Sequence, residues 1–99
     1  MPEDVMALIS AAIAAKADQA AGTVRFTMKS GAKFVAIQVS EAALRAVDPS
    51  AMDRAGSFET FKSYRKYFER IASHKYDFGN LEHDGSVHIR PRDVPEKSG

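Results

Sequence analysis

The chain has neither cysteine nor tryptophan among its 99 residues. Without cysteine it cannot form a disulfide framework, carry out thiol catalysis or bind zinc through sulfur. A charge bias is also absent, because 14 Lys and Arg residues stand against 13 Asp and Glu residues. The chain as a whole therefore has no general attraction to nucleic acid or to anionic lipid, and such a partner would have to bind a local patch.

A hydrophobic run long enough to cross a membrane is missing too. The most apolar stretch, Val5 to Ala15, falls short of the roughly 18 residues of a membrane helix. It follows Pro2, Glu3 and Asp4, whereas an export signal requires positive residues at that place. We therefore expect a cytoplasmic protein without a membrane partner.

The composition that remains is that of a soluble globular protein, with 44% hydrophobic and 27% charged residues. A chain of this length organises one hydrophobic core. We predict an N-terminal accessory helix over residues 1–22, one small α+β domain over residues 23–94 and a frayed tail over residues 95–99.

The first 21 residues are rich in alanine, the residue with the highest helix propensity. Their large apolar side chains recur three or four positions apart, as on one face of a helix. These side chains are Val5, Leu8, Ile9 and Ile13. We expect a helix from Glu3 to Ala21. Its apolar stripe is too small to form a core alone, so we expect it to pack on the sheet or on the same helix of a second chain.

After Thr23 the apolar period changes to two, which is typical of strands. Two such runs flank Ser30-Gly31 and predict a hairpin, and a third strand follows Asp84-Gly85. One face of this sheet is expected to enter the core. Its residues are Val24, Phe26, Met28, Val35, Ile37, Val39, Val87 and Ile89.

Helix signals occupy the stretch between the second and third strands. Ser40 is expected to cap a short helix, and Asp48-Pro49 begins a brief helical turn. Ser57 is expected to cap a long helix that Gly79 ends and that has an aromatic face. The predicted architecture is α+β: a small, mainly antiparallel, three-stranded sheet packed against this long helix, with the alanine-rich helix added at the N-terminus.

A set of turn and helix-end motifs marks the stretch from Val24 to Val94. The motifs are the strand pair around Ser30-Gly31, Ser-Glu-Ala-Ala-Leu from Ser40, Ile71-Ala72-x-x-Lys75-Tyr76-Asp77-x-Gly79, and Asp84-Gly85-x-Val87-x-Ile89 ending near Asp93. In these motifs the chain resembles a family of small bacterial proteins known as domain of unknown function 1488. The resemblance implies a small α+β domain, and it implies no active site, because the activity of the family is not established.

The sheet face opposite the core presents cationic and aromatic side chains. They are Arg25, Lys29, Phe34, Gln38, His88 and Arg90. Open sheets bind single-stranded nucleic acid when cations neutralise phosphates and bases stack on an aromatic ring. The more ordinary interpretation is that Phe34 is covered by the N-terminal helix or by a partner while the charges are solvated.

Metal binding and catalysis receive little support from the remaining residues. The nitrogen ligands available to a metal are His74, His83 and His88. His83 and His88 are an odd number of residues apart, so on one strand they point to opposite faces. Ser73 and His74 are neighbours on a helix and cannot meet as nucleophile and base. An acid–base enzyme would need a concave pocket around His74 and Tyr76. We predict no metal, no cofactor and no catalytic residue.

The function that we predict is therefore that of a non-enzymatic module that works through protein contacts. The expected form is a homodimer with the N-terminal helix in its interface. Nucleic-acid binding by the sheet face stands as the alternative. The two hypotheses place the working surface on different parts of the chain, the N-terminal helix for the first and the sheet face for the second.

Overall fold

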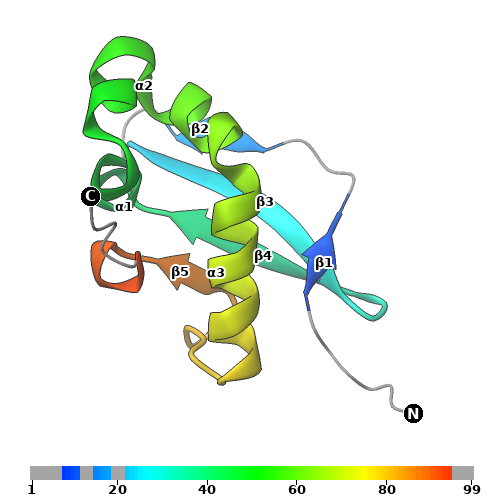
Figure 1. The fold of residues 1–99 in the computed structure, drawn as a ribbon. Coiled ribbons are helices and arrows are strands. Elements are labelled where there is room, and N and C mark those ends of the chain that lie inside the picture. Colours follow the sequence, from blue (N-terminus) through cyan, green and yellow to red (C-terminus); the bar gives the residue numbers. More distant parts are fainter. Residues whose placement is uncertain (1–7, 12–14, 19–21, 95–99) are drawn as a thin grey trace.

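The computed structural model describes residues 8–11, 15–18 and 22–94, and in it a layer of helices covers one face of a mixed sheet (Figure 1). The strands are β1 (Ile9–Ser10), β2 (Lys16–Asp18), β3 (Thr23–Ser30), β4 (Lys33–Val39) and β5 (Val87–Ile89). The helices are α1 (Glu41–Val47), α2 (Pro49–Ser63) and α3 (Arg65–Asp77), with a 3-10 turn, η1 (Pro91–Asp93), after β5. The predicted α+β class is confirmed.

The sheet runs in the order β1-β3-β4-β5, and β2 also pairs with β3. The predicted hairpin is confirmed as β3 and β4, with Met28 opposite Val35. Two details of the predicted sheet are wrong. The described residues form five strands, and β5 runs parallel to β4. The direction of β5 follows from the three helices between β4 and β5, since parallel neighbours require a crossover connection.

The helix predicted from Glu3 to Ala21 is wrong over the residues that the structure describes there. β1 and β2 are short strands that pair antiparallel with β3. Leu8, directly before β1, is 5% exposed, whereas Ile9 is 58% exposed. Pairing satisfies backbone groups along the outer edge of β3, a tertiary gain that outweighs the helix propensity of alanine.

The outcome for the predicted dimer helix follows from these strands. Leu8 lies in the core, its carbonyl accepts a hydrogen bond from the Ser73 hydroxyl at 3.2 Å, and Ile9 lies on the opposite face of the sheet. Val5 and Ile13 fall outside the described residues, as does the tail predicted at 95–99. The two described residues of the amphipathic stripe, Leu8 and Ile9, therefore lie on different faces of the sheet.

The core lies between the sheet and the helices. All eight sheet residues predicted to face it are buried, which confirms the assignment of the two sheet faces. From the helices, Phe61 and Phe68 are fully buried, with ring centroids 6.0 Å apart, and Phe26 lies 4.9 Å from Phe61. The Arg65 guanidinium covers the rings of Phe26 and Phe61 at 5.5 and 5.7 Å.

The prediction of one continuous helix from Ser57 to Gly79 is wrong, because two helices, α2 and α3, occupy this stretch. Tyr64 separates α2 from α3, with φ −116° and ψ 22°. Its hydroxyl donates a hydrogen bond of 2.7 Å to Asp48, the residue that caps α2. This tertiary contact connects the break to the start of α2, and helical periodicity gives no sign of it. Gly56 has φ +86° and kinks α2.

Candidate nucleic-acid interface

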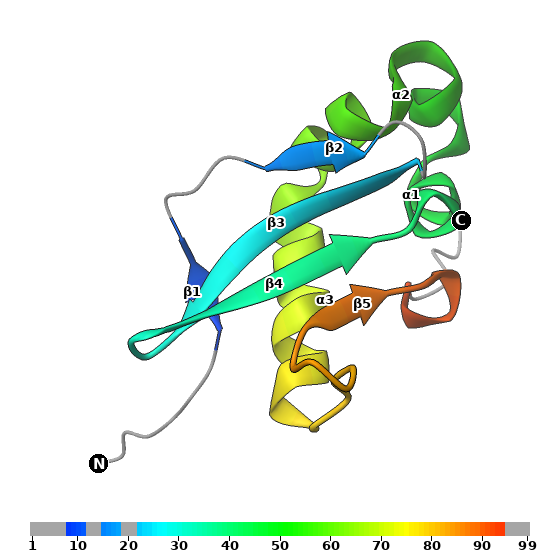
Figure 2. The same cartoon turned by 180° about the vertical axis from the view of Figure 1, so that it is seen from behind.

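The helices leave the other face of the sheet open among the described residues, as the view from behind shows (Figure 2). The strand residues that alternate with the buried core residues point to this face. In the strand register they form rows that cross the sheet. The open face therefore combines side chains from β1, β2, β3, β4 and β5.

The row nearest the hairpin turn carries an exposed aromatic ring. Ile9 lies opposite Lys29, and Lys29 lies opposite Phe34. Phe34 is 59% exposed, and the Lys29 ammonium lies 5.6 Å from the centroid of its ring. This row offers a π surface, a cation and an aliphatic side chain next to one another, which is the chemistry of base stacking beside a phosphate contact.

The row at the other end of the strands carries two cations and an imidazole. Lys16 lies opposite Arg25, Arg25 opposite Gln38, and Gln38 opposite His88. Arg25 and Lys29 are four residues apart on β3, or roughly 13 Å at the rise of an extended strand. Thr27 and Ala36 lie between the rows, and because their side chains are small, they project little from the face.

A shallow hollow of about 200 Å³ lies beside Arg25 and His88. Asp84 lines it and carries the one acidic charge among its lining residues. Hydrogen bonds from the side chain and the backbone N–H of Ser86 hold the pKa of Asp84 below its ordinary value. This carboxylate therefore stays ionised at neutral pH, and it lowers the positive potential at the His88 end of the face.

Arg90 does not join this surface as predicted. It follows the end of β5, and its guanidinium forms an ion pair with Glu82 at 3.2 Å. Because Glu82 neutralises its charge, Arg90 is a weak candidate for a phosphate contact. Arg25, Lys29, Phe34 and His88 are brought together as the strand pattern predicted.

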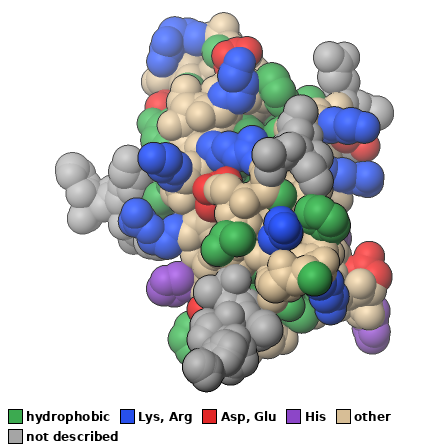
Figure 3. All heavy atoms as spheres, turned by 90° about the vertical axis from the view of Figure 1, so that its right-hand side faces the viewer, with side chains coloured by type: hydrophobic (Ala, Val, Ile, Leu, Met, Phe, Trp, Pro, Cys, Tyr) green, Lys and Arg blue, Asp and Glu red, His purple; other side chains and the backbone are tan. Residues whose placement is uncertain are grey.

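Two residues of the open face escaped the sequence analysis. Lys16 and Ile9 join it because β1 and β2 are strands. The sequence carries little signal for them: Leu8 and Ile9 are adjacent apolar residues, so no period-two pattern marks β1, and β2 has only three residues. Viewed from the β1 side, Lys and Arg side chains are scattered among exposed hydrophobic side chains (Figure 3).

The histidines do not assemble a metal site in the described part of the chain, where no three His, Cys, Asp or Glu side chains come together. His83 and His74 are exposed and His88 is half-buried. No helix among the described residues is long and apolar enough to span a membrane.

Comparison with known proteins rests on the fold. The sequence matches no protein-family model and no curated protein. The structure is similar to the crystal structure of a protein of unknown function from the DUF1488 family of Shewanella loihica PV-4. The TM-score is 0.68 at 12% sequence identity, and the match covers 85% of this chain and 92% of the other. The resemblance to domain of unknown function 1488 that the motifs predict is thus confirmed, and it establishes a shared α+β fold.

Proposed function

We propose that the open sheet face binds single-stranded nucleic acid. The observation that carries the proposal is the exposed ring of Phe34, set among the cations of a face that none of the described helices covers. The ordinary alternative, in which an N-terminal helix buries Phe34, loses its support because β1 and β2 are strands in the described residues. The absence of cysteine fits an activity in the cytoplasm.

The arrangement suits a flexible strand better than a duplex. A base can stack on Phe34 while phosphates contact Lys29 and Arg25, and an unpaired strand can bend to follow a nearly flat face. The major groove of DNA instead admits an α-helix or a two-stranded ribbon, and the open face presents neither. Asp84 repels phosphate beside His88, so we expect the phosphates to contact Lys29 and Arg25 on β3 rather than His88.

The test is fluorescence anisotropy of a labelled oligothymidylate titrated with the protein at several salt concentrations. Phe34→Ala should weaken binding about five- to a hundredfold, the effect of losing one stacked base, and leave the salt dependence unchanged. Arg25→Gln and Lys29→Gln should each reduce the slope of log affinity against log salt by about 0.7, the value for one phosphate contact on a single strand.

The matched control is Lys66→Gln. Lys66 is an exposed residue of α3, in the helical layer, so its removal changes the net charge equally without touching the open face. We expect its binding curve and salt slope to match those of the unmodified protein. Absence of binding at low salt, or an equal loss of slope in Lys66→Gln, would overturn the proposal.

A second candidate is a homodimer through the same end of the sheet. Ile9 and Phe34 are large exposed hydrophobic side chains in one row, and a second copy would remove both from water. Pairing would also bring copies of Lys29 and Arg25 close together. Dimerisation should therefore strengthen with salt, whereas nucleic-acid binding weakens with salt.

Light scattering tests the second candidate. A dimer predicts twice the chain mass of 10.8 kDa, rising in population with salt, and Phe34→Ser should return the protein to a monomer. A monomer mass at every salt concentration would exclude this dimer.

A further inference from the structure

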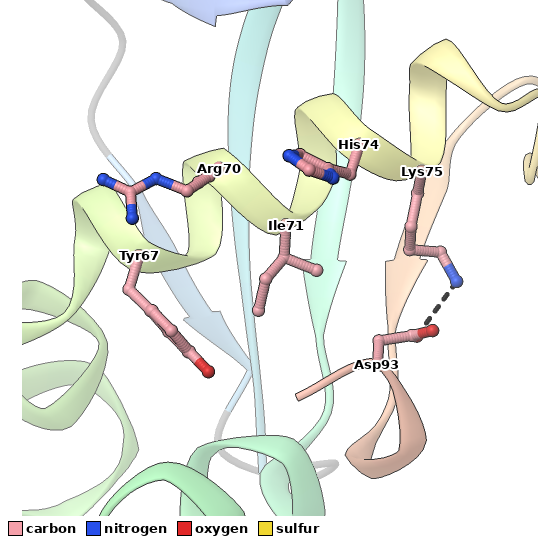
Figure 4. A pocket seen from close by; sticks show the side chains of 6 residues that line it. All are labelled: Tyr67, Arg70, Ile71, His74, Lys75 and Asp93. Carbon is pink, nitrogen blue, oxygen red and sulfur yellow. Dashed lines mark hydrogen bonds and ion pairs between the residues drawn. The ribbon is translucent and has the colours of Figure 1, made fainter. Parts of the chain in front are cut away.

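A cavity of about 280 Å³ lies between α3 and η1 (Figure 4). Its lining residues are Tyr67, Arg70, Ile71, His74, Lys75 and Asp93. None of them belongs to the sheet face described above. Cavities of this size are at the lower end of the range for small-molecule sites, so a ligand here would be small.

The spacing on α3 arranges these side chains around the cavity. Tyr67, Ile71 and Lys75 are four residues apart and form one line along the helix, and Arg70 and His74 form the neighbouring line. Tyr67 and Ile71 supply an apolar wall. Arg70 and His74 bring nitrogen donors to the same opening.

The far side of the cavity is closed by an ion pair. Lys75 Nζ lies 2.9 Å from Asp93 Oδ2, and the two side chains are 14% and 18% exposed. Burial raises the pKa of Asp93, but the Arg90 backbone N–H and the Lys75 ammonium lower it more, so the pKa lies below its ordinary value. Lys75 and Asp93 therefore neutralise each other.

Two groups remain without a partner among the described residues. Arg70 has no ion pair there, and it leaves the cavity with a net positive charge. The Tyr67 hydroxyl is buried and has no hydrogen-bond partner, although such groups are rare because they forfeit their hydration. An anion would complement the first group and a polar substituent the second.

We propose that this cavity binds a small organic anion: a carboxylate on an apolar body that carries a second polar group. Arg70 would bind the carboxylate at the opening through its guanidinium fork. The apolar body would pack on Ile71, and the second polar group would hydrogen-bond to the Tyr67 hydroxyl. Inorganic phosphate is a poor fit, because the apolar wall would strip its water without replacing it.

The experiment follows backbone amide chemical shifts during titration with three probes: 4-hydroxybenzoate, benzoate and phenol. The first has both polar groups, and the other two each lack one. We expect saturable shifts at residues 67–75 and 93, with 4-hydroxybenzoate binding tightest. Arg70→Gln should weaken 4-hydroxybenzoate about ten- to a hundredfold, the effect of one charge-assisted hydrogen bond, and leave phenol unchanged.

Tyr67→Phe should weaken 4-hydroxybenzoate about two- to tenfold and leave benzoate unchanged. It should fold at least as stably as the unmodified protein, because it removes a buried hydroxyl that lacks a partner. Lys62→Gln on α2 removes one charge away from the cavity and should bind all three probes normally.

The proposal is overturned by any of three results: no saturable shifts at the cavity, benzoate affinity that Arg70→Gln leaves intact, or a Lys62→Gln effect as large as that of Arg70→Gln. Because the oligonucleotide test uses other variants on the opposite side of the sheet, either proposal can fail without the other.

Discussion

Asp48 connects the end of α1, the start of α2 and the break between α2 and α3 through its hydrogen bonds. Its carboxylate accepts hydrogen bonds from the Ala51 backbone N–H at 3.0 Å and from the Tyr64 hydroxyl at 2.7 Å, and its own backbone N–H donates to the Leu44 carbonyl. One side chain thus caps the start of α2 and holds the break between α2 and α3, directly after the end of α1.

We expect Asp48→Ala to lower the free energy of unfolding by about 1 kcal/mol through the lost cap alone, with a further loss from the Tyr64 contact. Urea denaturation measures both. Asp53→Ala is the matched control, because Asp53 forms an exposed ion pair with Arg45 at 3.1 Å, and exposed pairs contribute little. Equal midpoints for the two variants would contradict the capping role.

Asp93 makes the stability of the protein depend on pH. Its pKa in the folded state is below the ordinary value, so the ionised carboxylate stabilises the fold. That contribution is complete above the ordinary pKa of an aspartate, about pH 4, and is lost as the pH falls through the lowered folded pKa. The unfolding midpoint should therefore decrease on acidification below about pH 4.

Lys75→Gln isolates this effect from that of Asp84, whose pKa is also lowered. Without the Lys75 ammonium at 2.9 Å, the pKa of Asp93 should rise and the loss of stability in acid should become shallower. Urea midpoints between about pH 2 and pH 5 test this, and an unchanged acid slope in Lys75→Gln would count against it.

At the scale of elements, the different burial of Leu8 and Ile9 distinguishes the observed structure from the predicted helix. On an amphipathic helix, Leu8 and Ile9 would share the apolar face, whereas in the structure Leu8, directly before β1, is buried and Ile9, on β1, is exposed. We expect Leu8→Ala to cost about 2–5 kcal/mol, the effect of a core truncation, and Ile9→Ala to cost under about 0.5 kcal/mol. Thermal or urea unfolding measures both, and similar losses would favour the helix.

Elements with strong local signals are those that the sequence predicted well. The Ser40 hydroxyl accepts from the Ala43 N–H at 3.1 Å, as expected of a helix cap, and β3 and β4, of eight and seven residues, alternate around their turn. The prediction of a continuous helix across Tyr64 failed, because the Tyr64 hydroxyl at the break donates its hydrogen bond to Asp48, 16 residues earlier. Local periodicity carries no information about such a partner.

At the scale of the whole molecule, the described residues 8–11 and 15–18 pack with the rest of the chain, and two strands among them belong to the sheet. Leu8 and Ala11 are buried, and β1 and β2 both cover the outer edge of β3. Deleting residues 1–21 should therefore remove part of the core and expose an edge strand. We expect a lower unfolding midpoint and aggregation, detected by urea denaturation and light scattering.

An accessory helix predicts a different result for the same deletion. The remaining residues 22–99 would then keep their unfolding midpoint and only a helix-mediated assembly would be lost. Deletion of residues 95–99 serves as the control for shortening the chain, because the sequence predicts a frayed tail there. An unchanged midpoint after the N-terminal deletion would restore the two-part division of the chain.

The sequence by itself determined which residues of β3, β4 and β5 face the core, where α1 begins and that Arg25 and Lys29 share a sheet face with Phe34, because these depend on alternation and on capping by near neighbours. Only the tertiary structure decided that the alanine-rich segment forms β1 and β2, that α3 is separate from α2, and that Tyr67 and Arg70 line a cavity with Asp93. Each of these outcomes depends on a partner far along the chain, and an unpaired strand edge or a lone carboxylate gains more from that partner than local propensity provides.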